Sequence, residues 1–382
     1  MIKSFTATTR EIDDAQAAVA EIITALDLEK NLLKNSLGII ACFSEFEETG
    51  VLKAICNALP FDCVGATTCL CACGQEVDQI IFAITVLTSD DCAFHTTAIP
   101  IAENYEASVD RAIAALIERS EKKPALLVSY FPFMTTVSGD MILATIDRAT
   151  GGIPLFGTMA IDHTVDYPTA KTIRNGEAFR ETAVLGAIFG TPKLSFAVAS
   201  LDASKIRKQK AVITGSDGNI LTGINGKTAL AYLEEIGLAK NDIATGLGVF
   251  PLVVDHMDGT TPVARAVFAL TPEGHAVCGG AMPVNATIAI GSLGTDDILY
   301  TTEKILKPFV EKDSIVLSYS CIARYFVLGA NFTAEAEKMR EMAVDTKYLF
   351  ACSGGEICPL PDGKGKLKNF FHNFTNVFCK LS

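Results

Sequence analysis

Three segments of the chain repeat one order of elements, in which a helical stretch separates two apolar runs. Runs this short on either side of a stretch with helical period predict strand–helix–strand units. The second and third units also begin alike, with LLVSY and VLSYS, which leaves internal duplication and chance similarity both open. The units span Leu37–Phe43, Gly50–Ala58 and Phe61–Ala66; Ala125–Tyr130, Ser138–Ala149 and Ile153–Phe156; and Ser314–Ser320, Thr333–Ala343 and Tyr348–Ala351.

Each second run opens into small or hydroxyl-bearing residues, such as Thr67 and Thr68 in the first unit and Ser353 to Gly355 in the third. Backbone of this kind leaves N–H donors exposed and room for a ligand at a strand end. An ordinary tight turn is the better explanation of any single copy. The repetition makes these strand ends candidates for a binding site.

The stretches between the units predict the fold class. Several have extended character and follow one another without a helix, which implies antiparallel pairing. The run Glu11–Leu33 has apolar residues at helical spacing and should cover a sheet face. We therefore expect an α+β fold of two lobes with mixed, largely antiparallel sheets flanked by helices. The extended stretches are Asp78–Thr88, Ala93–Ile99, Thr182–Phe189 and Leu194–Ser200.

The length of 382 residues favours two domains. Charged Asp202–Lys210 is the best junction between them, which predicts domains 1–208 and 209–382, with a boundary accurate to about ten residues. Beyond the junction, Ser216–Asn219 predicts a hairpin turn and Gly226–Ile236 a helix. A further helix should begin at Thr295, its expected N-cap.

Charge and hydropathy exclude several function classes. A net charge of -12 repels phosphate backbones and anionic lipid, so we expect no nucleic-acid binding. The N-terminal residues are polar and the most apolar runs are short and interrupted, which predicts neither secretion nor membrane insertion. We expect a cytoplasmic protein.

The cysteines predict neither disulfides nor a metal site. Six of the 12 lie in apolar runs, where reduced thiols behave as small buried hydrophobic groups. The cluster Cys69, Cys71, Cys73 has no histidine at a zinc-like spacing. The glycine pairs lack the context of a nucleotide-binding loop, so no metal and no cofactor is expected.

Three ordered motifs in the C-terminal half resemble those of the FIST C-terminal domain. They are Cys321-Ile322-Ala323-Arg324 after one strand, Gly355-Glu356-Ile357 after the next, and a terminal His372-Asn373-Phe374-Thr375. Upstream, Val64–Thr68, Gly151–Pro154 and Ala183–Ile188 are similar to the FIST N-terminal domain, although Cys69–Cys73 stand where its signature has a glycine. The resemblance covers nearly the whole chain.

The resemblance implies a sensory protein that binds a small polar molecule such as an amino acid. It implies a ligand site formed by Cys321, Arg324, Ser353, Gly354, Gly355, Glu356, His372, Asn373, Thr375, Thr67 and Thr68. Members are commonly joined to output domains. Here we expect a stand-alone form that relays its signal to a separate signalling protein.

The side chains suit such a ligand, but other readings stay open. Arg324 offers a planar fork to a carboxylate and Glu356 can accept from an ammonium group, or the two pair with each other. Asn373 and Thr375 should share one face of a strand. Cys321, His372 and Glu356 are also the residue types of a nucleophile, a base and an orienting group, so a cysteine-dependent enzyme is the alternative to a sensor. A ligand-free interaction scaffold is the third.

Overall fold

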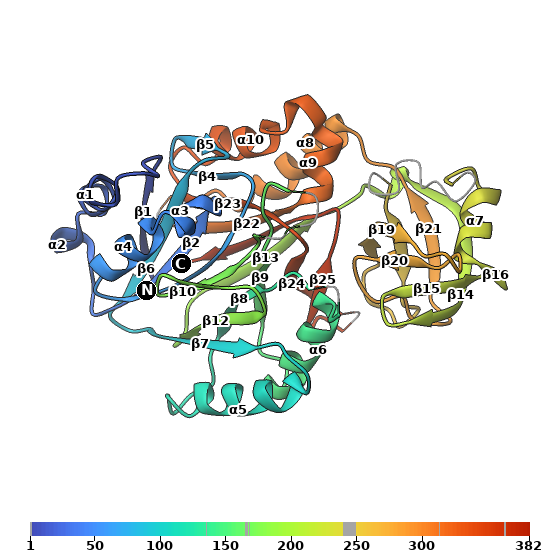
Figure 1. Ribbon diagram of the computed structural model, residues 1–382, viewed down its shortest axis with the longest axis horizontal. Helices are drawn as coiled ribbons and strands as arrows, with labels where there is room; N and C mark the ends of the chain where they lie inside the picture. Colours follow the sequence, from blue (N-terminus) through green and yellow to red (C-terminus); the bar gives the residue numbers. More distant parts are fainter. Residues whose placement is uncertain are drawn as a thin grey trace.

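The computed structural model describes residues 2–382 except 135, 165–166, 168, 240–249, 313 and 363. Figure 1 shows a large body and a smaller lobe beside it. Three six-stranded sheets form the body, and the lobe has a separate, antiparallel set of strands. The expected α+β class with mixed sheets flanked by helices is confirmed.

The three sheets of the body share one pairing pattern. Each has a central parallel pair, and every other pair of neighbouring strands is antiparallel. The parallel pairs are the three predicted strand–helix–strand units. In order across each sheet, the strands are β1 (Lys3–Thr9), β6 (Phe82–Ser89), β2 (Asn35–Cys42), β3 (Asp62–Thr67), β10 (Thr172–Arg174) and β11 (Glu177–Phe179); β7 (Ala93–Pro100), β12 (Thr182–Phe189), β8 (Leu126–Phe131), β9 (Leu155–Met159), β24 (Glu356–Pro361) and β25 (Leu367–His372); and β13 (Leu194–Ala199), β26 (Asn376–Leu381), β22 (Ile315–Cys321), β23 (Lys347–Ser353), β4 (Cys71–Cys73) and β5 (Glu76–Asp78).

The terminal hairpin of each sheet comes from a different unit. The hairpin β4–β5 follows β3 in the chain but joins the third sheet; β10–β11 follows β9 and joins the first; β24–β25 follows β23 and joins the second. The exchange closes into a cycle, so the three sheets are interlocked. Identical topology in all three supports repetition of one structural unit.

Helices cover the outside of the sheets and leave a central core between them. The inner faces contribute Ile39 and Ala41, Val128 and Tyr130, and Leu317 and Tyr319 to one cluster. The first sheet packs on α1 (Ala15–Leu26) and α4 (Val51–Ala58), beside the short α2 (Leu28–Asn31) and α3 (Glu45–Glu48); the second on α5 (Tyr105–Ile117) and α6 (Gly139–Thr150); and the third on α8 (Thr295–Leu306), α9 (Ile322–Leu328) and α10 (Ala334–Met342).

Two local features follow from backbone geometry. The helix expected over Glu11–Leu33 divides between α1 and α2, because Asp27 adopts a left-handed conformation with φ 46°. Gly65 and Gly157 each lie two residues before the end of their strand. A Cβ there would lie 2.1 Å from the Ile40 carbonyl oxygen or 1.7 Å from that of Ser129, so both positions need glycine.

The lobe is an insertion between β13 and α8 with its own apolar core. The chain enters it at Ile206 and leaves at Gly291. The expected boundary at 208 falls at this entrance, but residues after the lobe return to the body and complete its second and third sheets. Its elements are β14 (Ile206–Asp217), β15 (Ile220–Ile224), β16 (Lys227–Thr228), α7 (Ala229–Glu235), β17 (Leu252–Asp255), β18 (Val263–Arg265), β19 (Val267–Leu270), β20 (Ala276–Cys278) and β21 (Thr287–Gly291).

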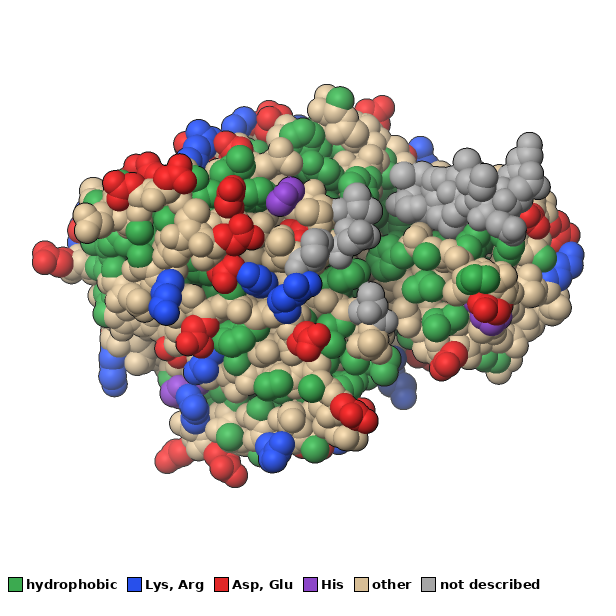
Figure 2. Space-filling view, in the orientation of Figure 1, with side chains coloured by type: hydrophobic (Ala, Val, Ile, Leu, Met, Phe, Trp, Pro, Cys, Tyr) green, Lys and Arg blue, Asp and Glu red, His purple; other side chains and the backbone are tan. Residues whose placement is uncertain are grey.

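On the face seen in Figure 2, Lys and Arg side chains are scattered among acidic ones. Across the described residues, every helix is too short or too polar to span a bilayer.

Candidate functional site

The ends of the second strands of the three units meet and hydrogen-bond in a cycle. The Ile161 N–H donates to the Thr67 carbonyl at 3.3 Å, and the Gly354 N–H to the Met159 carbonyl at 3.0 Å. The Thr68 hydroxyl closes the cycle by donating to the Cys352 carbonyl at 2.9 Å. The fold thus brings Thr67 and Thr68 from the first unit to the Ser353–Gly355 segment of the third.

Glu356 begins β24 beside this cycle and is fully buried. Its Oε2 accepts from the Thr375 hydroxyl at 2.8 Å. Its Oε1 accepts no hydrogen bond of good geometry; among buried side-chain nitrogen and oxygen atoms of the described residues, this holds only for that oxygen and the Thr85 hydroxyl. Burial raises the pKa of the Glu356 carboxyl well above its usual range. The Ser353 hydroxyl lies close enough to the carboxyl to oppose the rise in its pKa. An unpaired buried carboxyl oxygen is costly, so it calls for a functional explanation.

The terminal motif forms a turn between two strands. β25 ends at His372, β26 begins at Asn376, and Phe374 has φ 59°, so the expected strand with Asn373 and Thr375 on one face is wrong. A left-handed residue reverses the chain and sends its neighbours to different partners. Thr375 contacts Glu356, whereas the Asn373 Oδ1 accepts from the N–H of Ala266 in the lobe at 3.4 Å.

His372 is buried and lies within hydrogen-bond distance of backbone. Its Nε2 is 3.1 Å from the Cys358 carbonyl oxygen, to which a protonated Nε2 donates. Burial lowers the pKa of His372 to about 4, so the ring is neutral at physiological pH. This hydrogen bond ties neighbouring strands together.

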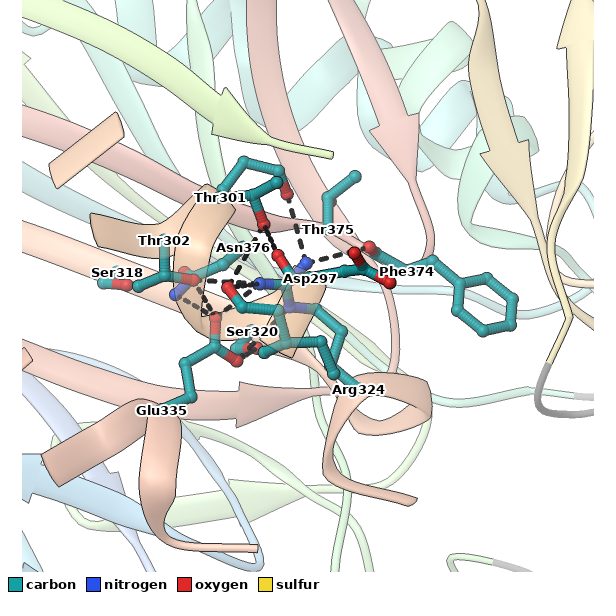
Figure 3. Close-up of polar contacts among 12 residues, drawn as sticks. Asp297, Thr301, Thr302, Ser318, Ser320, Arg324, Glu335, Phe374, Thr375 and Asn376 are labelled. Carbon is teal, nitrogen blue, oxygen red and sulfur yellow. Dashed lines mark hydrogen bonds and ion pairs between the residues drawn. The ribbon is translucent and has the colours of Figure 1, made fainter. Parts of the chain in front are cut away.

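Arg324 lies at the centre of a buried polar network (Figure 3). Its side chain is 0% exposed, and Nη2 lies 2.7 Å from Glu335 Oε1. Nε donates to Glu335 Oε2, while Nη1 donates to the carbonyls of Ala199 and Phe374. Nη2 also donates to the Ile298 carbonyl. Each guanidinium nitrogen is thus bound to protein acceptors.

The carboxylate that pairs with Arg324 is Glu335, and not Glu356 as the alternative reading had it. Glu335 stands in the first turn of α10, eleven residues after Arg324, and is 2% exposed. The Ser320 hydroxyl and the Asn376 amide also donate to its carboxylate. These contacts hold the pKa of Glu335 below its usual value despite burial. The hydrogen bonds of its three guanidinium nitrogens leave Arg324 no free donor for a ligand carboxylate.

Cys321 is buried at the start of α9. Burial, followed by the nearby Glu356 carboxyl, raises its thiol pKa well above the usual range. A thiol in this setting is a poor nucleophile. The described residues show no hydrogen bond between Cys321 and His372, whose Nε2 faces the Cys358 carbonyl instead. These contacts do not support the enzyme alternative.

Two further candidate functional residues, Arg265 and Asp140, could not be identified from the sequence. Arg265 of β18 is only 2% exposed and forms an ion pair at 3.3 Å with Asp140 of α6. Its Nη1 donates to the Phe371 carbonyl at 2.7 Å. These residues lie 125 positions apart and join the lobe to the body, a contact that periodicity and local motifs cannot reveal.

Among the described residues, no group of three or more His, Cys, Asp or Glu side chains could hold a metal ion. An open hollow of about 510 Å³ lies at the start of β3, away from the strand-end cycle. Two of the polar residues that line it, Asp62 and Asn175, hydrogen-bond to each other.

Comparison with known families and structures gives two domain matches. The FIST N domain model matches residues 36–227 and the FIST C domain model residues 229–359. No curated protein matches the chain. A solved structure described as "Cyanuric acid hydrolase: evolutionary innovation by structural concatenation" is 9% identical, with a TM-score of 0.34 over 100% of this chain and 98% of that one. A TM-score this low supports no inference.

Proposed function

Since the chain belongs to the FIST family of signal-transduction sensory domains, we propose that it binds a small polar molecule through the Glu356 carboxyl group. The ligand carries an amino group, as an amino acid does. The protein acts in the cytoplasm and passes the signal to a separate protein.

The unpaired Glu356 Oε1 is the observation that carries this proposal. An ammonium or amine N–H placed there would satisfy the oxygen and offset the cost of its burial. The Thr375 hydroxyl already fixes the other carboxyl oxygen. A ligand-free scaffold gives no reason for one carboxyl oxygen to be left unpaired inside an otherwise satisfied network.

The other motif residues support this site without all touching the ligand. Thr67, Thr68 and Ser353 to Gly355 form the strand ends around it. Arg324 positions the 373–375 turn, and His372 ties β25 to β24. Cys321 lies close enough for the Glu356 carboxyl to affect its thiol pKa.

A thermal-shift screen of amines and amino acids tests the ligand site. At about 100 times its Kd a ligand stabilises the folded state by about 2.7 kcal/mol. We expect Glu356→Gln to lower the affinity of any stabilising amine at least about tenfold, because the replacement removes the negative charge and one acceptor while keeping the shape. Glu341→Gln on the exposed end of α10 is the matched control and should bind normally. Equal affinity in Glu356→Gln and wild type would place the site elsewhere.

Proton release on binding tests the class of ligand. The free Glu356 carboxyl has a raised pKa, and a bound ammonium group would lower it. Binding of an amine should therefore release a proton, so its affinity should rise with pH up to the pKa of the free carboxyl. Titration calorimetry of the hit amine in buffers of different ionisation enthalpy measures the proton count. Proton uptake, or none, would contradict an ammonium partner for Glu356.

A further inference from the structure

We propose that the 373–375 turn couples the Glu356 site to the docking of the inserted lobe, so that ligand binding changes how firmly the lobe is held. The inference rests on the proposed function for its ligand. Its structural part, a mechanical link from Glu356 to the lobe, stands on contacts of its own.

Three consecutive residues of the turn reach three different parts of the molecule. Asn373 accepts from the Ala266 N–H of the lobe. The Phe374 carbonyl accepts from Arg324 at 3.4 Å. The Thr375 hydroxyl donates to Glu356. A shift of the Glu356 carboxyl therefore reaches the lobe through this short turn, in which Phe374 has a left-handed backbone.

The seam between body and lobe is an apolar cluster built around the Phe374 side chain, which is 0% exposed. From the lobe it receives Ala264 and Ala266, from the body Cys321 and Ala323, and from the two connecting segments Leu201 and Leu293. The lobe approaches the turn closely, since a Cβ on Gly279 would lie 2.3 Å from Asn373 Oδ1. Because the residues at this seam are small, the position of the turn determines how closely the lobe packs against the body.

Arg324 binds the body end of each of the two segments that connect the lobe to the body. It binds the carbonyl of Ala199, where β13 ends before the lobe, and that of Ile298 in α8, which follows the lobe. The connections are also tied to each other, because the Ser292 N–H donates to the Lys205 carbonyl at 3.0 Å. These ties fix a hinge near residues 199–205 and 291–298, about which the lobe would turn.

A second anchor lies beside the first, since Asn373 approaches Gly279 and Asp140 approaches Gly280. Asp140 in α6 accepts from the Ala281 N–H at 2.7 Å and pairs with Arg265. In Figure 1, α6 and β25 lie on the side of the body that faces the lobe, and β25 contacts β18. Two anchors and a hinge allow docked and loosened states, and a ligand shifts their balance when it binds one state better.

Hydrogen exchange of Thr375→Val tests the link without a ligand. Loss of the hydroxyl frees the turn from Glu356, so amides in residues 263–267 and 279–282 should exchange at least about fivefold faster. Residues 211–224 in the lobe's core should not change. Thr172→Val, another buried threonine whose hydroxyl bonds a carbonyl at 2.6 Å, is the matched control and should leave the seam unaffected. Unchanged exchange at the seam, or equal acceleration throughout the chain, would overturn the inference.

Asn373→Ala and the bound amine provide independent readouts. Asn373→Ala removes the contact with Ala266 and should accelerate exchange in the same seam segments, even if Thr375→Val fails to fold. The amine found by the thermal-shift screen should alter seam exchange in wild type and not in Glu356→Gln. If an amine binds but leaves exchange at the seam unchanged, the coupling is rejected and the proposed ligand site is not. Failure of every amine to bind, with seam exchange still faster in both variants, would instead reject the ligand and keep the link.

Discussion

Arg324→Ala is expected to lower the free energy of unfolding by about 3–5 kcal/mol, the range for breaking a buried ion pair by removing one partner. The cost comes from Glu335, which would remain buried and charged without its counter-ion. The carbonyls of Ala199, Phe374 and Ile298 would also lose a donor. Urea unfolding followed by circular dichroism measures the loss.

Two further variants make this test specific. Arg148→Ala removes an exposed arginine that pairs with Asp110, and should cost under about 1 kcal/mol. Arg324→Met combined with Glu335→Leu should recover part of the loss, since apolar residues of similar volume replace a buried pair at little cost. A loss under about 1 kcal/mol in Arg324→Ala would show that Glu335 is compensated by its other donors.

Because of this cost, Arg324→Ala is a poor test of ligand binding. A variant that unfolds or loosens the lobe loses its ligand for indirect reasons. Glu356→Gln avoids the problem by keeping the volume of the side chain. The proposal therefore gives the two motif residues different tasks: Arg324 supports the turn, whereas Glu356 is the residue proposed to bind the ligand.

Local periodicity was enough to predict the building units of the body. The second unit's expected helix, Ser138–Ala149, is observed as Gly139–Thr150, and the expected strand Ser314–Ser320 as Ile315–Cys321. Apolar spacing sets such elements directly because each buries one face against the core. The convergence of the strand-end segments followed from the family resemblance and from their positions at strand ends.

Long-range pairing could not be predicted in this way. Nothing in the sequence of β4, Cys71–Cys73, indicates that it joins the third sheet instead of the one it follows. Glu335 looks like an ordinary acid in the first turn of a helix, where it favours the positive end of the dipole. Its burial against Arg324 depends on how α10 packs against α8 and β4, which are far from it in the sequence.

Acidification from pH 6.5 to 4 is expected to cost the folded state about 3 kcal/mol through His372 alone. The folded pKa of His372 is lowered to about 4, against about 6.5 in an unfolded chain. Within this window the unfolded state binds the extra proton, so stability falls as pH falls. Glu356 acts in the opposite sense: its raised folded pKa makes stability fall as pH rises above the usual range of a glutamate.

His372→Gln separates the two contributions, because a glutamine amide can still donate to the Cys358 carbonyl but does not titrate. Urea unfolding at pH 4, 5, 6 and 7 should show the variant gaining about 3 kcal/mol on wild type between pH 7 and pH 4. In the same series, the unfolding free energy of Glu356→Gln should no longer fall as pH rises. It should still fall as pH falls, because His372 is unchanged. If the difference in unfolding free energy between wild type and His372→Gln stays constant with pH, the folded protein accepts a proton on His372 as readily as the unfolded chain does. The neutral ring would then not be part of what holds β25 to β24 beside the ligand site.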